Sequence, residues 1–414
     1  MFENVLGQPV TQLLSEAINR NSLAPALLFV GPDASAKLTT ALETARVISC
    51  EGDGSWACTC ESCKRHKDFV SPDLLLMGQR DAVLETKAAA RALCTHKTPA
   101  ARYLFTRSVR KLTTRFDSRL WDTDEARFLK AAPILAELDE ELADLLSYYD
   151  QAESFSAEDE KKLEKQTGKI TGLCEKLQDE CLYDALPVNQ VRKASAWVRL
   201  MPSGKKKVLI VENADKMQES ARNAFLKILE EPPEYAVFIL TTVRRTAIMP
   251  TILSRVRPYL FSEREAAYQQ AVIERVFRDQ AFCKNLPSGQ SPRIVSYLRN
   301  FLPVSSVQLT EAAALLWEYC IQRIQYEQRP PLPVLSAVLH DYRCRIAAAA
   351  EPVPSAILKI IHNGKPHCVY ILFLESLISF LQIALHSGSC SIYELECYAL
   401  FSRFVQEALQ SVDI

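Results

Sequence analysis

The sequence predicts an α/β fold in which a five-stranded parallel sheet is accompanied by a large share of helix. Only 11 of the 414 residues are glycine, well below the usual share of about 7%, and this scarcity favours helices over turns and loops. Five short apolar runs alternate with helical patterns, as expected of parallel strands covered on both faces. The runs are Ala26–Val30, Asp73–Met77, Lys207–Glu212, Ala236–Thr242 and Arg257–Phe261.

A helical insertion is predicted between the second and third strands, at about residues 101–186. No glycine occurs between Gly78 and Gly168, and leucines recur at helical spacing within that stretch. Ser156 and Asp159 form a capping box that opens a second helix. The first inserted helix is basic, which indicates either a solvated face or a surface for a partner or nucleic acid. Its basic residues are Arg102, Arg107, Arg110, Lys111, Arg115 and Arg119.

Beyond Phe261 we find only helical patterns, which predict a small helical domain at 262–304 and a helical bundle at 305–414. The apolar stretch Val369–Leu385 contains Glu375, so we expect a buried helix and no membrane partner. Lysine plus arginine total 49 and aspartate plus glutamate total 50, a balance that gives no overall field to attract nucleic acid or membranes. The first residues lack a secretory pattern, and we expect a cytoplasmic protein with reduced cysteines.

A near P-loop follows the first predicted strand, at Gly31–Leu38. Gly31 and Lys37 have the spacing of the pattern G-x-x-x-x-G-K-[ST], but Ala36 replaces the second glycine and Leu38 replaces the hydroxyl residue. A methyl group at position 36 crowds the N–H groups that approach phosphates, and leucine cannot bind Mg²⁺. We therefore expect no ATP hydrolysis by this chain, while weak phosphate binding through Lys37 stays open.

The third strand ends in Glu212 and Asn213, where a Walker B strand normally ends in two acids. The first acid holds Mg²⁺ through water, and the second orients the attacking water. Asparagine cannot act as a base. This second departure strengthens the expectation that hydrolysis is lost.

Four cysteines cluster in the loop at residues 50–66, and they predict a structural zinc site. Cys60 and Cys63 have the C-x-x-C spacing that places two thiolates on tetrahedral zinc, and Cys50 would close the site. Cys58 is very close to Cys60, so the fourth ligand is either Cys58 or His66. A redox pair and unbound thiols remain alternatives.

Several segments resemble the bacterial DNA polymerase III clamp-loader AAA+ subunits of the gamma/tau and delta-prime family. The resemblance is strong over residues 1–77 and 188–261, weak for the helical C-terminal part, and absent for the insertion. It implies an AAA+ module at 1–261, a lid domain at 262–304 and a collar domain at 305–414. The segments that carry it are Phe2–Gln8, Asn21–Ala24, Asn223–Pro233 and Thr251–Arg255.

The resemblance also implies roles for individual residues. Arg255, in the pair Ser254-Arg255, is similar to the arginine finger that reaches a neighbour's ATP, although Val256 stands where the family usually has cysteine. A surface salt bridge is the alternative interpretation of Arg255. Thr241 and Thr242 take the sensor-one position, and Arg293 lies near the sensor-two position.

A retained finger beside a damaged P-loop resembles the delta-prime stator. The implied partners are the gamma/tau and delta subunits, with the sliding clamp contacted indirectly. Contact with primed DNA would be weak and non-specific, and candidate groups are Lys205–Lys207 and Arg244-Arg245. The alternatives are an active gamma/tau-like ATPase and a nucleic-acid-binding adaptor that acts through the insertion.

Overall fold

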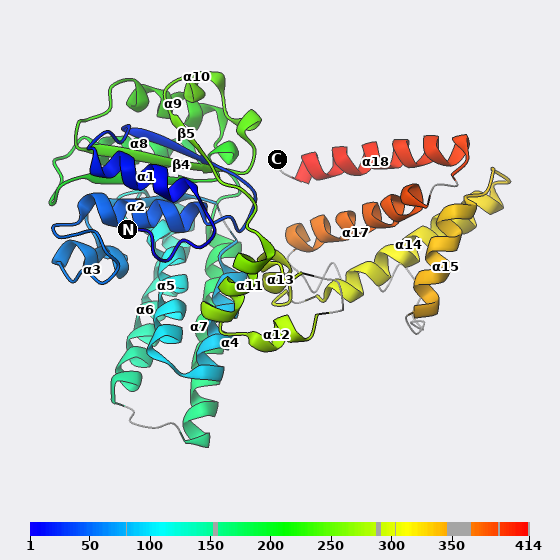
Figure 1. Ribbon diagram of the computed structural model, residues 1–414, viewed down its shortest axis with the longest axis horizontal. Helices are drawn as coiled ribbons and strands as arrows, with labels where there is room; N and C mark the ends of the chain where they lie inside the picture. Colours follow the sequence, from blue (N-terminus) through cyan, green and yellow to red (C-terminus); the bar gives the residue numbers. More distant parts are fainter. Residues whose placement is uncertain are drawn as a thin grey trace. The chain divides into compact units, whose positions relative to one another are not determined.

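The computed structural model describes residues 1–79, 81–151, 156–286, 291–302, 304–345, 366–387 and 390–412. The chain divides into two compact units, Met1–Leu298 and Arg299–Ile414. Figure 1 shows the elements of each unit.

The first unit contains the predicted parallel sheet, and the prediction of five strands is confirmed. The strand order is β2-β3-β4-β1-β5, with every pairing parallel. Because the strands are parallel, the loops after β1, β3 and β4 lie at one edge of the sheet. The strands are β1 (Ala26–Val30), β2 (Leu74–Gly78), β3 (Lys207–Glu212), β4 (Ala236–Thr242) and β5 (Arg257–Leu260).

Each face of the sheet packs against its own hydrophobic core. Leu27 and Phe29 of β1 join the core under α1 (Val10–Asn19) and α2 (Lys37–Ser49), while Leu28 points into the other core. That second core also contains residues of α8 (Val188–Val198), α9 (Glu219–Glu230) and the inserted helices. The alternation follows from the two-residue period of a strand.

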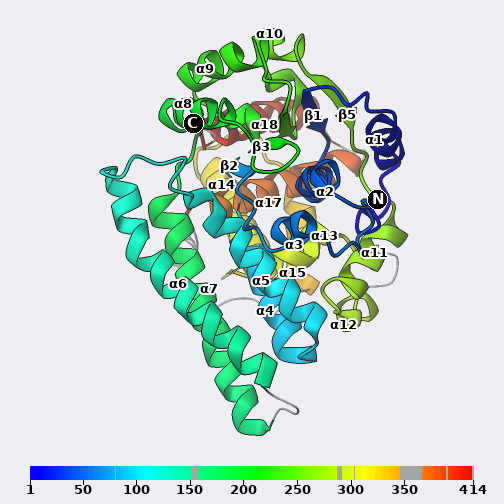
Figure 2. The same cartoon turned by 90° about the vertical axis from the view of Figure 1, so that its left-hand side faces the viewer.

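The insertion is a bundle of four helices, whose arrangement Figure 2 shows. They are α4 (Val83–His96), α5 (Pro99–Thr113), α6 (Ala126–Gln151) and α7 (Ala157–Cys181). The helix α4 precedes the predicted insertion but packs against α5 and α7, so the bundle begins at residue 83. The capping box of Ser156 and Asp159 at the start of α7 is confirmed.

The basic residues of α5 bind other parts of the same unit, so the interpretation of this helix as a solvated basic face is wrong. Arg107 and Arg110 donate to the backbone carbonyl oxygens of Lys67 and Asp68 at 3.1 and 2.9 Å. Lys111 pairs with Glu85. These cations hold the bundle to its neighbours.

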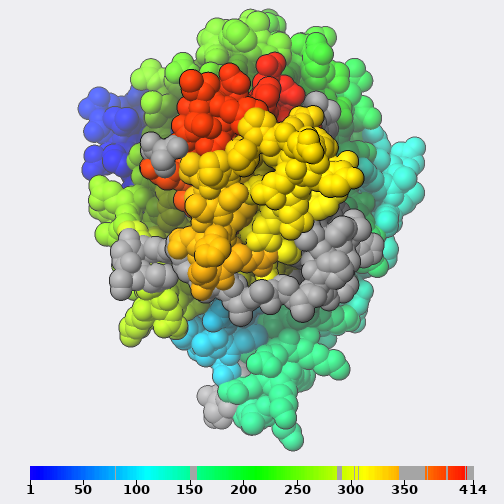
Figure 3. All heavy atoms as spheres, turned by 90° about the vertical axis from the view of Figure 1, so that its right-hand side faces the viewer, coloured from blue at the N-terminus to red at the C-terminus, as the bar shows by residue number. Residues whose placement is uncertain are grey.

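Short helices complete the first unit, and the described residues of the second unit contain four long helices. The short ones are α10 (Pro250–Leu253), α11 (Ala266–Arg275), α12 (Gln280–Lys284) and α13 (Ile294–Arg299). The second unit has a core that includes Trp317, Phe373 and Phe380, and Figure 3 shows its surface in yellow to red. In the described part of the chain, no helix is both long and apolar enough to span a membrane. The four long helices are α14 (Ser306–Tyr326), α15 (Pro333–Arg345), α17 (Pro366–His386) and α18 (Ile392–Val412).

Two glycines should respond oppositely to the same substitution. Gly78, at the end of β2, has φ +105°, and a Cβ there would lie 2.1 Å from the carbonyl oxygen of Glu212. Gly168 lies within α7, and an added Cβ would meet nothing within 4 Å. We expect Gly78→Ala to lower the free energy of unfolding by about 1–3 kcal/mol and Gly168→Ala to raise it by about 0.5–1 kcal/mol. Urea unfolding followed by circular dichroism measures both, and shifts of equal sign would contradict this packing.

Candidate nucleotide and metal sites

The lysine of the near P-loop, Lys37, forms hydrogen bonds with the backbone of the same loop. Residues 31–36 join β1 to α2, and the Lys37 ammonium donates to the carbonyl oxygens of Gly31 at 2.5 Å and Pro32 at 2.6 Å. Lys37 is only 9% exposed. A phosphate bound here would have to draw this ammonium away from those carbonyls.

Ala36 of this loop has a backbone conformation that usually requires glycine. Ala36 has φ +69°, in the left-handed region that costs a non-glycine residue about 1–2 kcal/mol. Gly31 itself is required by its neighbour, because a Cβ there would lie 2.4 Å from the carbonyl oxygen of Phe261. The loop shape is therefore set by packing against the segment after β5, independently of any phosphate.

Arg264, which lies outside this loop in the sequence, holds it through hydrogen bonds. Its guanidinium donates to the carbonyl oxygens of Ala34 at 2.7 Å and Leu6 at 2.9 Å. Burial lowers the pKa of Arg264 to about 10. No sequence pattern indicates this contact, because the hydrogen-bond partner of an arginine cannot be inferred from composition.

Hydrogen bonds connect the ends of β3 and β4 to the loop. The Gly31 N–H donates to the carbonyl oxygen of Thr242 at 3.2 Å, and the Asn213 N–H donates to the Thr241 hydroxyl at 3.2 Å. The Thr242 hydroxyl donates to the Asp215 carboxylate at 2.6 Å. The structure therefore brings Gly31, Lys37, Glu212 and the two threonines to one edge of the sheet.

The Walker B acid is paired with an arginine from the insertion. Glu212 forms an ion pair with Arg115, whose guanidinium also donates to the carbonyl oxygen of Gly78. The two side chains are 8% and 2% exposed. The guanidinium thus neutralises the carboxylate that would otherwise hold Mg²⁺ through water. Sequence reasoning noted Arg115 only as one of several basic residues.

A stack of aromatic rings fixes the position of Arg115. Arg115 lies in the 3-10 turn η1 (Thr114–Phe116) at the end of α5, and its carbonyl oxygen accepts from the Trp121 indole N–H at 2.8 Å. Trp121 stacks on Phe116 and on Tyr183, with ring centroids 5.3 and 5.6 Å apart. The turn is therefore held rigidly under the end of β3.

Arg255 lies at the surface in a local ion pair. Its guanidinium contacts the Glu230 carboxylate at 2.9 Å and donates to the carbonyl oxygen of Thr251 at 2.8 Å. The side chain is 33% exposed. Ser254 also bonds to Thr251, through its hydroxyl at 2.9 Å.

Arg293, assigned from sequence near the sensor-two position, forms an exposed ion pair with Glu263 at 2.9 Å, and 63% of its side chain is exposed. The lysines proposed for DNA contact donate to backbone carbonyls instead. Lys205 bonds to Cys50, Lys206 to Glu234 and Lys207 to Trp197, at 2.5 to 2.8 Å.

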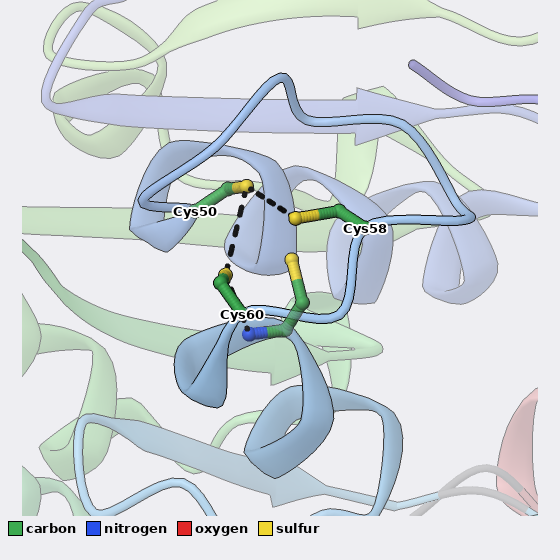
Figure 4. Close-up of side chains that lie close together, drawn as sticks. Cys50, Cys58 and Cys60 are labelled. Atoms are coloured by element: carbon green, nitrogen blue, oxygen red, sulfur yellow. Dashed lines mark hydrogen bonds between the residues drawn. The ribbon is translucent and has the colours of Figure 1, made fainter.

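The four predicted cysteines converge. The sulfur atoms of Cys50, Cys58, Cys60 and Cys63 all lie within 4.8 Å of one another. The Cys50 sulfur is 3.6 Å from that of Cys58 and 3.9 Å from that of Cys60 (Figure 4). Zinc–sulfur bonds of about 2.3 Å place tetrahedral sulfurs about 3.8 Å apart, so the cluster could hold zinc with Cys58 as fourth ligand.

Hydrogen-bond donors favour the thiolate of Cys60, whereas burial raises the pKa of Cys63 and the contact with Cys50 raises that of Cys58. The buried Arg46 donates to the Cys63 sulfur at 3.0 Å and to the carbonyl oxygen of Ser55 at 3.0 Å, and it pairs with Glu43 at 2.6 Å. Burial opposes ionisation of Cys60, but N–H groups of Glu51 and Cys63 outweigh it and lower the pKa of Cys60 to about 6. Such donors orient and stabilise metal-binding thiolates.

His66, the alternative ligand, lies outside this group. Burial lowers the pKa of His66 to about 4, and its Nε2 lies 3.4 Å from the Ser71 hydroxyl. The donor set is therefore four sulfurs. The spacing of the residues left the choice between Cys58 and His66 open, because spacing does not show the direction in which a side chain points.

The sheet order, the loop after β1 and the acid at the end of β3 define an AAA+ module with a cysteine cluster. A family model described as "DNA polymerase III, delta subunit" matches residues 7–119 and 144–265, more than half of the chain. The chain belongs to this DNA polymerase III clamp-loader family. The match includes parts of segment 101–186 that the recognised motifs did not cover.

Curated relatives match over shorter regions. The DNA polymerase III subunit gamma/tau of Mycobacterium bovis is 37% identical over 70 residues, which are 17% of this chain and 12% of the relative. The subunit tau of Bacillus subtilis is 36% identical over 90 residues, 22% and 16% of the two chains. The chain thus spans less than a fifth of either relative.

Among solved structures, a DNA polymerase III gamma subunit-related protein from Thermotoga maritima has a TM-score of 0.37. It is 13% identical, and the match covers 95% of this chain and 91% of the other.

The strained alanine of the loop gives a prediction about stability. Ala36→Gly should raise the free energy of unfolding by about 1 kcal/mol, because glycine adopts φ +69° without steric cost. Ala41→Gly is the matched control, since Ala41 lies inside α2, and it should lower the free energy of unfolding by at least about 1 kcal/mol. Thermal unfolding measures both. A loss of stability in Ala36→Gly would contradict the strain.

Proposed function

We propose that this chain is a delta-prime-like stator of the DNA polymerase III clamp loader, which lends Arg255 to the ATP site of a neighbouring subunit. The observation that carries the proposal is the buried pair of Arg115 and Glu212. This pair supports the proposal that the chain's own site does not hydrolyse ATP. Membership of the clamp-loader family supports the proposal that the chain acts together with other subunits.

The pair opposes magnesium binding energetically. To hold Mg²⁺ through water, Glu212 would have to leave Arg115 as a buried, uncompensated charge, and breaking such a pair costs about 3–5 kcal/mol. Leu38 supplies no hydroxyl for the ion, and Asn213 supplies no base. Asn213 instead donates its amide to the carbonyl oxygen of Gln79 at 2.7 Å.

Unlike the buried pair of Arg115 and Glu212, the ion pair of Arg255 is exposed to solvent. A surface ion pair such as that with Glu230 is worth about 0–1 kcal/mol, so the guanidinium can exchange this partner for a phosphate at small cost. In a neighbouring site it would stabilise the charge of the transferred phosphoryl group. In this proposal Arg255 therefore acts on the ATP that is bound to another subunit.

The remaining assignments follow from this role. Residues 262–304 would form the lid, and 305–414 the collar that joins gamma/tau and delta subunits. Contact with the sliding clamp is indirect, and contact with DNA is to phosphates and non-specific. Arg293 and the threonines at the end of β4 keep the positions of sensors without turnover.

The cysteine cluster would hold one structural zinc ion. Four sulfurs in tetrahedral reach leave no position for water or substrate, which argues against catalysis by the metal. Arg46 offsets part of the charge of four thiolates.

The finger is tested in the assembled complex with gamma/tau. Arg255→Ala should lower ATP turnover at the adjacent gamma/tau site by about 10³-fold, because the phosphoryl charge loses its guanidinium. Single-turnover hydrolysis measures this rate. Arg257→Ala, two residues along in β5 and also exposed, is the control and should leave turnover unchanged.

An unchanged rate in Arg255→Ala would refute the finger. If the chain alone hydrolyses ATP with Mg²⁺, and Lys37→Ala abolishes this, the chain is an active gamma/tau-like ATPase instead. Salt-dependent DNA binding that disappears on deletion of residues 101–186 would favour the adaptor.

The metal site gives a stoichiometric prediction. Purified protein should contain about one zinc per chain, and Cys60→Ser combined with Cys63→Ser should remove it, because two of four ligands are lost. Elemental analysis measures the content. Cys344→Ser changes an exposed cysteine outside the cluster and should retain the zinc, whereas a metal-free wild-type protein would refute the site.

A further inference from the structure

One side of the helix α5 contacts the segment that contains the cysteine cluster. The turn η1, which follows α5, carries Arg115, the partner of Glu212. We name residues 50–68 the cysteine module. Tyr103 of α5 lies edge-on to Trp56 of the module, with ring centroids 6.2 Å apart. Its hydroxyl donates to the carbonyl oxygen of Lys67 at 3.4 Å. Arg107 and Arg110 donate to the carbonyls of Lys67 and Asp68.

These carbonyls belong to the end of α3 (Glu61–Lys67), a helix of seven residues. Cys60 caps its start, and Cys63 lies within it. An isolated helix this short is unstable in water, and α3 is held by its packing on α2 and by the positions of Cys60 and Cys63. The acceptors of Arg107 and Arg110 therefore depend in part on the same cysteines as the cluster.

At its other end, α5 continues into η1 and Arg115. From Arg107 to Arg115 the chain is helical throughout, which corresponds to about 12 Å at about 1.5 Å per residue. Phe105, Val109 and Leu112 anchor this length in the core. A continuous helix transmits a displacement at one end to the other.

We infer that α5 is a strut that couples metal occupancy of the cysteine module to the pair of Arg115 and Glu212. With the cluster occupied, α3 holds Arg107 and Arg110, and α5 holds η1 so that Arg115 neutralises Glu212. With the cluster empty, α3 loosens, the two arginines lose their acceptors, and the pair opens. This inference rests on the proposed zinc site but not on the stator role.

Hydrogen–deuterium exchange on the full chain, with and without a zinc chelator, tests the coupling. Removal of zinc should increase exchange in residues 50–68, and also in 99–121 and at the end of β3, by about tenfold, because charge-assisted bonds are lost. Residues 219–230 of α9 should keep their exchange rate. An increase confined to 50–68 would show that the core alone holds α5, and would overturn the strut.

A variant with the cluster intact separates the strut from metal-dependent folding. Arg107→Gln combined with Arg110→Gln should retain its zinc and still exchange about tenfold faster in residues 114–121. The matched control is Arg323→Gln combined with Arg403→Gln, two exposed arginines of the second unit, which should leave residues 114–121 unchanged. Unchanged exchange in the α5 variant would refute the strut even where zinc is present, whereas absence of zinc in wild type would refute the metal site and, with it, the coupling to metal.

Discussion

The ion pair of Arg115 with Glu212 is the interaction on which the arrangement of the first unit depends. Both charges are buried, and a buried charge is stable only when a partner and further hydrogen bonds compensate it. Arg115 must therefore be held in place, which Trp121 and the carbonyl of Gly78 do. The insertion is consequently part of the AAA+ module's own core, because it supplies the cation at the end of β3.

The backbone of the loop after β1 is held by contacts with its neighbours. Ala36 has a left-handed backbone conformation, with φ +69°. Arg264 and Phe261 impose the geometry from outside. These contacts hold the loop in the shape that follows from the spacing of Gly31 and Lys37.

Local patterns predicted local structure well. The five strands, the capping box at Ser156 and the cysteine cluster depend on spacing within a few residues, and the structure confirms them. The contacts of Arg115 and Arg264 could not be predicted, since Arg115 and Glu212 are 97 residues apart and a basic residue does not specify its acceptor. The same limit explains the wrong interpretation of α5 as a solvated face, because helical periodicity does not show what packs beside a helix.

In the proposed stator role, the energetic contrast between the near P-loop and Arg255 would direct the action of the chain towards a neighbouring subunit. Lys37 and Glu212 are buried in bonds to the chain itself, so an incoming nucleotide with magnesium must first break strong internal interactions. Arg255 is held mainly by a solvated glutamate and a nearby carbonyl, and water already screens that attraction. An anion presented by another subunit therefore competes easily for Arg255, while an anion at the chain's own loop competes poorly for Lys37. In the role that we propose, an exposed arginine that can reach a neighbour, together with a poorly accessible nucleotide site of its own, is what a non-hydrolysing partner of an ATPase requires.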